Sequence, residues 1–345
     1  MWAVRTASFR LRWVARLSRL FPPAVSGVFL RMYPLAAAGR DNLSFEARSS
    51  LGRTRIRADR AERVSLWFAI RGYLEWPSIV IARTVCRPGD VVYDVGGNIG
   101  TETLPLAEIV GPSGVVECFE PLPENVRTLH EHIELNGARQ IRVHPNAVAD
   151  RAATLPFSPP ATCVNRGEGY LDAQAGPGSI QVATVVLDDL LARGVIRPPR
   201  LIHMDVQGAE LFVLRGARQM LTEARPVLIL ESAPPCLAVH GLKPSDVRDF
   251  LREQDYALFD VDRFGLSTAL REDIITNWLA LPARPDEQAD QLARRIHRRI
   301  IRAALLPLIP GLNPAVLRCC AVALMEKGVR WWSTCPAGDI RLFGG

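Results

Sequence analysis

Apolar and polar positions along the middle of the chain follow a pattern that predicts strands and helices in turn. Short apolar runs bounded by turn residues are typical of strands buried in a parallel sheet, and the longer segments between them carry apolar residues at helical spacing. The runs expected to form strands are 91–94, 115–119, 141–143, 201–205, 227–230, 256–261 and 277–281. This alternation predicts an α/β fold with an open, doubly wound, mainly parallel seven-stranded sheet that binds ligands at the carboxyl ends of its strands.

The helices are predicted from apolar residues three and four positions apart and from the turn residues that flank them. Between the strands they are expected at 101–110, 124–135, 187–192, 211–221 and 244–254. Two more amphipathic stretches, interrupted near Gly72 and Pro77, precede the first strand. We therefore expect three parts, of which the first and last are helical extensions: a basic N-terminal extension (1–58), a central domain (59–282) and a basic and apolar C-terminal extension (283–345).

The N-terminal extension carries seven arginines before its first acid, Asp41. A helix over 4–20 would have two distinct faces, one apolar with Phe9, Trp13, Leu17 and Leu20, and one basic with Arg5, Arg12, Arg16 and Arg19. Such a helix can lie on an anionic membrane surface, act as a transit-type segment, or pack against the central domain. The sequence leaves these three interpretations open.

The C-terminal extension repeats this pattern, with five arginines between positions 294 and 302 interleaved with Ile296, Ile300 and Ile301. Prolines then interrupt the chain before a strongly apolar stretch at 316–325. Two basic amphipathic ends suggest peripheral membrane contact or a homo-oligomer, whereas a solvated helical face is the default interpretation of either end alone. Nucleic acid is not an expected partner, because neither end interleaves its basic residues with an aromatic stacking platform. No apolar run reaches 18 residues, so a transmembrane span is not expected.

The composition indicates the class of protein and its cellular compartment. An apolar content of 48% and a mean hydropathy of +0.07 indicate a globular chain with ample core. Arginine carries nearly all of the basic charge in a net balance of +6. The seven cysteines form no C-x-x-C pair, which favours reduced thiols over a disulfide framework or a zinc site. We therefore expect a cytoplasmic protein, with peripheral binding at the inner face of the membrane left open.

The segment 91–100, V-V-Y-D-V-G-G-N-I-G, is expected to form a strand, a glycine turn and the start of a helix. Its spacing matches neither G-x-G-x-x-G nor G-x-x-x-x-G-K-[ST], the patterns of dinucleotide and phosphate sites. Asp94 stands two residues before the first glycine. A carboxylate there would repel a pyrophosphate but suits the cationic amino-acid end of S-adenosylmethionine. A purely structural turn is the alternative.

Polar residues stand at the ends of five predicted strands, which places them along one edge of the sheet. Glu120 lies 26 residues after Asp94, where a carboxylate would bind the two hydroxyls of a ribose. Asn146 follows the third strand and is expected either to read an adenine ring or to cap a turn. Asp205 and Glu231 complete the row. This convergence is more informative than any one of its members.

The segment 158–179 breaks the alternation, because it is rich in proline, glycine, asparagine and serine. A loop of that length in a compact domain is usually functional or mobile. We expect it to cover the acceptor side of the site, with a decorative surface loop as the alternative.

Five motifs, taken together and in this order, resemble the FkbM family of S-adenosylmethionine-dependent methyltransferases. They are D-V-G-G-N-I-G (94–100), C-F-E-P (118–121), L-D-D-L (187–190), M-D-V-Q-G-A-E-L-x-V-L-R-G-A (204–217) and R-P-V-L-I-L-E (225–231), within a resemblance that covers 59–282. The family is usually written D-V-G-A-N-I-G and K-I-D-V-E-G-A-E. Gly97, His203, Met204 and Gln207 depart from that pattern, and Gln207 removes a carboxylate.

The resemblance implies a Rossmann-like class I methyltransferase fold, S-adenosylmethionine as the methyl donor, and O-methylation. The acceptor that it implies is a hydroxyl of a sugar, a glycan, a glycolipid or a secondary metabolite. The residues expected to bind the donor are Asp94, Gly96, Asn98, Gly100, Glu120 and Asn146. Neither the sequence nor the resemblance names the acceptor.

Methyl transfer to a hydroxyl is an in-line displacement, in which a base removes the hydroxyl proton as the new bond forms. The catalytic candidates are Asp205, His203 and Glu231, with Glu210 as a further acid nearby. Asp205 can alternatively cap the helix that follows it. No metal is expected, although Asp205 and Glu231 as ligands of a metal ion remain an alternative.

Two other classes of function also remain open for this sequence. One is a catalytically silent methyltransferase fold that serves as a binding module, against which the intact Asp94, Gly96, Gly100 and Glu120 argue. The other is a nicotinamide-dependent dehydrogenase, which the missing G-x-G-x-x-G disfavours.

Overall fold

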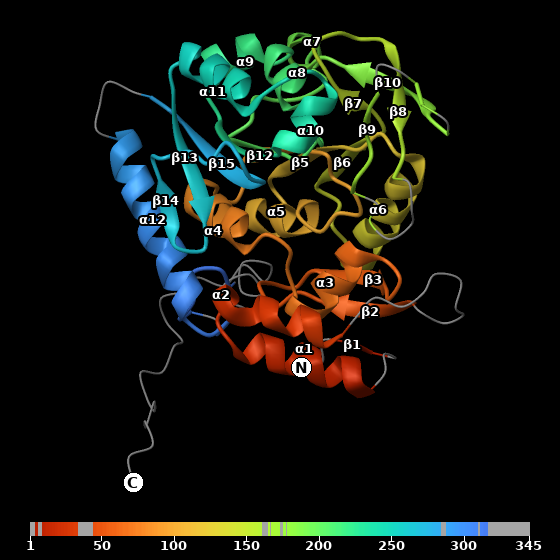
Figure 1. Cartoon of the computed structure of the whole chain (residues 1–345), viewed down its shortest axis with the longest axis vertical. Helices are drawn as coiled ribbons and strands as arrows, with labels where there is room; N and C mark the ends of the chain where they lie inside the picture. The colour runs from red at the N-terminus through yellow and green to blue at the C-terminus, as the bar shows by residue number, and fades with distance from the viewer. Residues whose placement is uncertain are drawn as a thin grey trace.

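The structure of the chain is a computed structural model, and it describes residues 4–5, 9–33, 44–160, 165, 167–172, 175–176, 178–283, 288–309 and 311–316. A large central sheet has helices on both faces, and two smaller sheets lie at its borders (Figure 1). The N-terminal helices gather at one end of the molecule, together with the C-terminal end of the last helix (Figure 1).

The central sheet follows the order β14-β13-β15-β12-β11-β4-β5-β6 in the described chain. Neighbours from β12 to β6 are parallel, and β15 lies antiparallel between β12 and β13. The strands are β4 (Val91–Val95), β5 (Val115–Phe119), β6 (Ile141–His144), β11 (Leu201–Met204), β12 (Val227–Ser232), β13 (Tyr256–Asp262), β14 (Gly265–Ser267) and β15 (Thr276–Pro282). The predicted doubly wound, mainly parallel sheet is confirmed. It has an eighth strand, β14, which forms a hairpin with β13.

Two hydrophobic cores fill the two faces of this sheet. Within β4, Val92 belongs to the core beneath α4, α5 and α12, whereas Tyr93 and Val95 belong to the core beneath α7 to α11. Both faces are therefore buried, which explains why the strands read as unbroken apolar runs. The helices concerned are α3 (Arg63–Arg71), α4 (Trp76–Val85), α5 (Thr103–Val110), α6 (Pro123–Asn136), α7 (Leu187–Ala192), α8 (Glu210–Arg215), α9 (Arg218–Glu223), α10 (Pro234–Val239), α11 (Pro244–Glu253) and α12 (Gln288–Leu305).

The single helix expected at 211–221 is instead two short helices, α8 and α9. The chain bends at Gly216, where a Cβ would lie 2.2 Å from the backbone oxygen of Ala149. The bend leaves the first N–H groups of α9 without helical partners. The carboxylate of Asp188 accepts two of them, from Gln219 at 2.8 Å and from Met220 at 2.9 Å. The L-D-D-L motif thus supplies the cap that lets the helix restart.

A four-stranded sheet of order β7-β10-β8-β9 lies beyond β6. Its strands are β7 (Ala147–Val148), β8 (Thr154–Ser158), β9 (Tyr170–Leu171) and β10 (Ile180–Val185). The segment 158–179, expected as a loop, therefore contains a short strand that pairs antiparallel with β8. Residues 161–164, 166, 173–174 and 177 lie outside the described chain.

The N-terminal segment packs on the central domain and shares its core. It contains a three-stranded antiparallel sheet and three helices: β1 (Val4–Arg5), β2 (Ser44–Arg48), β3 (Arg55–Asp59), α1 (Phe9–Leu20), α2 (Pro23–Ser26) and the 3-10 helix η1 (Gly27–Met32). Leu11 of α1 and Ile56 of β3 belong to the same hydrophobic cluster as Val80 of α4. β3 also spans the expected boundary between residues 58 and 59, so that division does not separate two folded units.

Helix α1 buries a different face from the one that its sequence suggested. The helix expected at 4–20 begins at Phe9, and its aromatic side chains Phe9 and Trp13 point outward. Arg19, expected on a solvated basic face, turns inward and donates to the backbone oxygen of Ala69 at 2.9 Å, and its burial lowers its pKa to about 10. The buried side chains are those of Leu11, Val14, Ala15 and Ser18.

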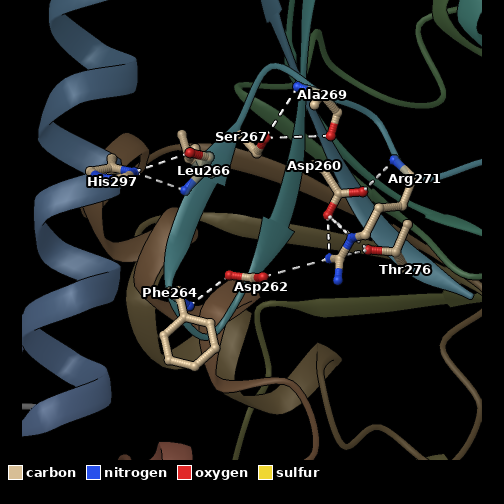
Figure 2. A network of polar contacts seen from close by, with 9 residues as sticks. All are labelled: Asp260, Asp262, Phe264, Leu266, Ser267, Ala269, Arg271, Thr276 and His297. Atoms are coloured by element: carbon tan, nitrogen blue, oxygen red, sulfur yellow. Dashed lines mark hydrogen bonds and ion pairs between the residues drawn. The ribbon is translucent and has the colours of Figure 1, made fainter.

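The apolar face of helix α12 packs against the rest of the protein. Ile296 and Ile300 are completely buried, and α12 packs on α4 and on the β13–β14 hairpin. Figure 2 shows how the hairpin is held, with the backbone N–H of Leu266 donating to Nδ1 of His297 at 2.9 Å. The basic amphipathic pattern at 294–302 thus marks a packed helix and not a free membrane face. The apolar stretch at 316–325 lies outside the described residues except for Val316.

On the far side of the hairpin, Arg271 forms an ion pair with β13 and a hydrogen bond with β15. Arg271 contacts the carboxylate of Asp260 through its guanidinium and its backbone N–H, and it also donates to the hydroxyl of Thr276 at 3.0 Å (Figure 2). In the part of the chain that is described, no helix is long and apolar enough to cross a membrane.

Candidate active site

The glycine turn after β4 is so tight that two of its residues have no room for a side chain. Gly96 has a φ of +92°, and a Cβ there would lie 1.9 Å from the backbone oxygen of Asp205. A Cβ at Gly97 would lie 2.1 Å from Sγ of Cys118. The cysteine therefore fills the space that the usual alanine methyl of the D-V-G-A-N pattern would need. Both glycine N–H groups donate to the backbone oxygen of Phe119, which fixes the turn against β5.

A cavity lies at the carboxyl ends of β4 and β5, beside this turn. Five of the residues expected at the sheet edge line it together: Gly96, Asn98, Glu120, Asn146 and Asp205. The rest of the wall includes Phe119, Phe157, Gly167, Gly169 and Leu171. The described part of the segment 158–179 therefore lies beside the expected donor residues, and its role as a cover for the acceptor stays a prediction.

Glu120 is buried with its carboxylate fixed by the turn. The backbone N–H of Asn98 donates to one oxygen at 2.7 Å, and the backbone N–H of Leu122 donates to the other at 2.9 Å. Burial outweighs these hydrogen bonds and raises the pKa of Glu120 to about 7. Each carboxylate oxygen can accept more than one hydrogen bond, so the hydroxyls of a ribose can add to these contacts.

Asn98 presents an unsatisfied acceptor at the same wall. Its side-chain Oδ1 is buried and has no hydrogen-bond partner among the described residues. A buried polar atom without a partner is costly, and a ligand N–H or O–H can satisfy it. The hydroxyl and amino groups of S-adenosylmethionine are such donors, so the residues present fit that group.

Two of the expected donor residues lie behind this wall and not on it. The carboxylate of Asp94 accepts from the hydroxyl of Thr103 at 2.5 Å and from Nδ1 of His203 at 2.9 Å. Gly100 packs against Leu129, whose Cδ1 lies 2.6 Å from the position of a Cβ at residue 100. Both residues shape the turn, and a direct contact of either with the donor is not supported by this geometry.

His203 lies between two carboxylates and is held as a cation. Its Nδ1 faces Asp94 at 2.9 Å, and its Nε2 lies 3.8 Å from the carboxylate of Glu75. Burial opposes the positive charge, but the two carboxylates outweigh it and raise the pKa of His203 well above its usual value. An imidazolium has no free lone pair to take a proton. This geometry favours a positioning role for His203, and its role as a general base stays a prediction.

Glu75 is the principal residue of this edge that the sequence did not reveal. Besides His203, its carboxylate accepts from Asn277 at 3.0 Å and from Ser78 at 3.1 Å. Burial favours the neutral acid, but these partners outweigh it and lower the pKa of Glu75. Glu75 stands at the start of α4, before the first strand of the central sheet, and no local pattern marks it as a member of the sheet edge. Glu102 lies beside it, and burial raises the pKa of that carboxyl well above its usual value.

Asp205 and Glu231 are joined by the amide of Gln207. Its Nε2 donates to Asp205 at 2.6 Å and to Glu231 at 3.2 Å. The family pattern has a glutamate at this position, which would place a third negative charge between the other two. The glutamine instead supplies donors to both carboxyl groups, so the departure at residue 207 stabilises the pair.

The two carboxyl groups are expected to differ in charge at neutral pH. One side of Asp205 is open to the cavity, but desolvation by the surrounding protein, followed by the charge of Glu75, raises its pKa to about 6. Burial, followed by the charge of Asp205, raises the pKa of Glu231 to about 9. The two carboxyl groups titrate as a pair in which Asp205 is the more acidic member, so Asp205 is the one that carries the negative charge first as pH rises. Such a pair can accept a proton from a hydroxyl.

The remaining acid, Glu210, closes the turn between β11 and α8. Its Oε1 faces the backbone N–H groups of Val206 at 3.4 Å and Gly208 at 3.3 Å, and burial raises its pKa to about 7. The N-cap of α8 is Ala209, so Asp205 does not cap this helix. Among the described residues, no group of three or more histidine, cysteine, aspartate or glutamate side chains is arranged to hold a metal ion.

A buried histidine connects the glycine turn to the N-terminal sheet. Nε2 of His132 accepts from the backbone N–H of Arg57 at 2.9 Å, and its Nδ1 faces the backbone oxygen of Ile99 at 2.7 Å. This pairing requires the neutral tautomer with its proton on Nδ1, and burial lowers the pKa of His132 accordingly. β3 is thus hydrogen-bonded to the turn that lines the cavity.

Part of this chain is similar to a described family of proteins. The family model of the methyltransferase FkbM domain matches residues 94–258, a narrower range than the 59–282 of the motif resemblance. The hexuronic acid methyltransferase AglP of Haloferax volcanii is 29% identical over 164 residues, which cover 48% of this chain and 62% of that protein.

Two further relatives are similar to part of this chain. The 2-O-methyltransferase NoeI of Sinorhizobium fredii is 26% identical over 180 residues, covering 46% of this chain and 73% of that protein. The 31-O-demethyl-FK506 methyltransferase FkbM of Streptomyces tacrolimicus is 30% identical over 177 residues, covering 41% of this chain and 67% of that protein. The similarity thus spans about two thirds of each relative and less than half of this chain.

Proposed function

Because this chain belongs to the FkbM family of methyltransferases, we propose that it transfers the methyl group of S-adenosylmethionine to a hydroxyl of a sugar, a glycan, a glycolipid or a secondary metabolite. The observation that supports this most directly is the meeting of Gly96, Asn98, Glu120 and Asn146 around one cavity. The wall of the same cavity includes Asp205, so a proton acceptor stands beside the donor residues.

The donor supplies an electrophilic methyl group on a sulfonium centre when it is bound. In this proposal Glu120 binds the ribose hydroxyls, Asn146 contacts the adenine, and Asn98 accepts from a donor N–H or O–H. Asp94 acts as a positioning residue, because it is buried behind the turn and outside the cavity wall, where its carboxylate accepts from Thr103 and His203. Its negative charge still lies close behind the turn, where it favours a cationic ligand.

Asp205 accepts the hydroxyl proton in the transfer step. As the bond between the acceptor oxygen and the methyl carbon forms, the bond between that carbon and sulfur breaks, and the proton moves to the carboxylate. In this proposal Glu231 is protonated at neutral pH, so the carboxylate of Asp205 does not stand beside a second negative charge. Gln207 holds both groups in place through its amide.

The acceptor class rests on the relatives. Two of them are named for a hexuronic acid and for 31-O-demethyl-FK506, and the third is named a 2-O-methyltransferase. The last two names specify transfer to oxygen, and a hexuronic acid also carries hydroxyls, so we propose a hydroxyl-bearing acceptor for this chain. Its exact acceptor can be sought by incubating the protein with labelled donor and a panel of glycosides and glycolipids.

Donor binding is tested first by replacing Glu120 with glutamine and measuring affinity for S-adenosylmethionine by calorimetry. Losing hydrogen bonds to a charged group is expected to cost about 1–3 kcal/mol. Glu124→Gln, an exposed residue of the following helix, is the matched control and should leave affinity unchanged. Equal affinities in the two variants would remove Glu120 from the donor site.

The same measurements separate the alternative functions. A catalytically silent binding module would bind the donor and transfer no label to any acceptor in the panel. A nicotinamide-dependent dehydrogenase would be stabilised against heat by a nicotinamide dinucleotide and not by S-adenosylmethionine.

A cytoplasmic location belongs to the same proposal and is supported by the free thiols of Cys86, Cys118 and Cys236. Self-association and peripheral membrane contact concern the ends of the chain, away from this site. Among the described residues, the N-terminal end leaves the larger group of apolar side chains exposed, seven within residues 9–32 against Leu305, Ile309 and Leu312 near the other end.

A further inference from the structure

Helix α1 is apolar on two opposite faces. Its inner face is completely or almost completely buried and consists of Leu11, Val14, Ala15 and Ser18. Phe9, Trp13 and Leu20 are 70%, 46% and 69% exposed. With about 3.6 residues per turn, positions 9, 13 and 20 fall in one row on the side of the helix away from the protein. The packing of α1 on the domain therefore leaves this row of large apolar side chains unexplained.

The exposed row belongs to a larger apolar region. Seven of the sixteen exposed large apolar side chains in the described chain fall within residues 9–32, so the enrichment is local. We call these seven the N-terminal apolar surface: Phe9, Trp13, Leu20, Phe21, Val25, Val28 and Met32. Helix α1 and η1 are in contact, and Arg10 donates to the backbone oxygen of Met32 at 3.1 Å, which joins the two segments. Figure 1 places α1 and α2 at one outer end of the molecule.

The charged residues of the segment 9–33, which carries this surface, are all basic. Arg10, Arg12, Arg16 and Arg31 are exposed beside it, and no aspartate or glutamate precedes Asp41 in the chain. The guanidinium of Arg16 lies over the ring of Trp13, 5.6 Å from its centroid, so basic and aromatic groups alternate along the helix. Large apolar patches bordered by polar groups usually mark an interaction site.

We infer that the N-terminal apolar surface binds the interface of an anionic lipid bilayer. Aromatic rings favour the boundary between headgroups and acyl chains, and the arginines of the same helix can pair with anionic headgroups. A second copy of this chain is a poorer occupant. A two-fold contact through this face would bring the arginines of one copy near those of the other, which an anionic surface does not do. This inference concerns a surface remote from the methyltransferase site and does not depend on the proposed function.

The test uses the full chain and measures cosedimentation with vesicles of phosphatidylcholine containing a quarter phosphatidylglycerol. The protein is expected to bind these vesicles at low salt, to be released as salt rises, and to bind pure phosphatidylcholine weakly. The double variant Phe9→Ser and Trp13→Ser should reduce the partition coefficient by about tenfold or more, because it removes the largest apolar side chains of the row.

The matched control is the double variant Val195→Ser and Val239→Ser, which removes exposed apolar side chains outside the N-terminal surface. It should bind vesicles as the unaltered chain does. Both double variants alter exposed side chains, so each should keep the unaltered melting temperature and donor affinity. Wild-type protein that stays in the supernatant with anionic vesicles would overturn the inference. So would a lipid-free dimer in analytical ultracentrifugation that the Phe9 and Trp13 changes abolish, since this would assign the surface to a second copy.

Discussion

Replacing Asp205 with asparagine tests whether this carboxylate is the base or only part of the architecture. The amide has the same size and keeps an oxygen that can accept from Gln207, as the carboxylate does at 2.6 Å. It cannot take the proton of an attacking hydroxyl. General-base catalysis contributes about 10²–10⁴-fold to turnover, or roughly 3–5 kcal/mol in the activation barrier. We expect turnover to fall by about that factor and donor affinity to change little.

Stability is expected to respond in the opposite direction from activity. The pKa of Asp205 in the folded protein is about 6, above the value of about 3.9 for an unfolded chain. A carboxyl with a raised pKa destabilises the folded state once pH exceeds the folded pKa, and it has no effect below the unfolded pKa. The charge-free asparagine should therefore leave the melting temperature at pH 8 unchanged or higher. A carboxylate acting as a helix cap would instead lose about 1 kcal/mol on substitution.

The assay combines transfer of a labelled methyl group to a glycoside panel with thermal unfolding at pH 5 and pH 8. Asp188→Asn is the matched control, because Asp188 uses both carboxylate oxygens to cap α9. That variant should lose stability and retain the chemical step. In the unaltered protein at saturating donor, where the titration of Glu120 does not enter, kcat/KM for the acceptor should rise as pH passes about 6 and Asp205 ionises. An Asp205→Asn enzyme with normal turnover, or with the stability loss of a cap, would refute the assignment.

Three further predictions concern the surrounding residues. Donor affinity should weaken as pH falls through about 7, because Glu120 then becomes neutral, and calorimetry between pH 6 and 8 measures this directly. Gly96→Ala should cost several kcal/mol in urea unfolding, since its Cβ would meet backbone at 1.9 Å, whereas Gly194→Ala, with open space around it, should cost only about 1–2 kcal/mol from its positive φ. Glu75→Gln should lower the pKa of His203 in an NMR titration, because one of its two carboxylate partners is lost, and an unchanged titration would contradict the ion-pair geometry.

Much of the fold follows from local sequence because both faces of the sheet are buried. An unbroken apolar run such as 115–119 can form only a buried strand or a buried helix segment, and its length between turn residues favours the strand. The break between α8 and α9 was not predicted, because Gly216 and its neighbours fit a continuous helix. The helix is interrupted by a tertiary contact with Ala149 and by a cap from Asp188, neither of which a local pattern contains.

The site was predictable where its residues come from strand ends. The topology of a parallel sheet brings those ends together, so Glu120, Asn146 and Asp205 reach one cavity from separate strands. Their protonation states were not predictable, since these depend on distances across the fold. In the sequence, His203 stands two residues before Asp205, a plausible position for a base. In the fold, Glu75 at the start of α4 lies close to its imidazole and favours the charged form. The donor, base and positioning roles of these residues remain predictions.

The N-terminal helix shows a related limit. Its aromatic face had the stronger apolar signal, but small side chains such as Ala15 and Ser18 allow the closer approach to α3 and were buried instead. Apolar periodicity identifies an amphipathic helix without saying which of two apolar faces the protein will use.

The hydrogen bonds of His132 make the N-terminal segment and the catalytic sheet interdependent. Removing β3 would take away the N–H of Arg57 and leave Nε2 of the buried His132 unpaired, on the same imidazole whose Nδ1 faces Ile99 in the donor turn. The part of the chain matched by the family model is therefore not an autonomous module that can be transplanted without the segment before it. A shortened protein that starts after Asp59 should bind the donor less tightly even though every residue of the cavity is present. In the whole chain, the two regions should melt in one cooperative transition.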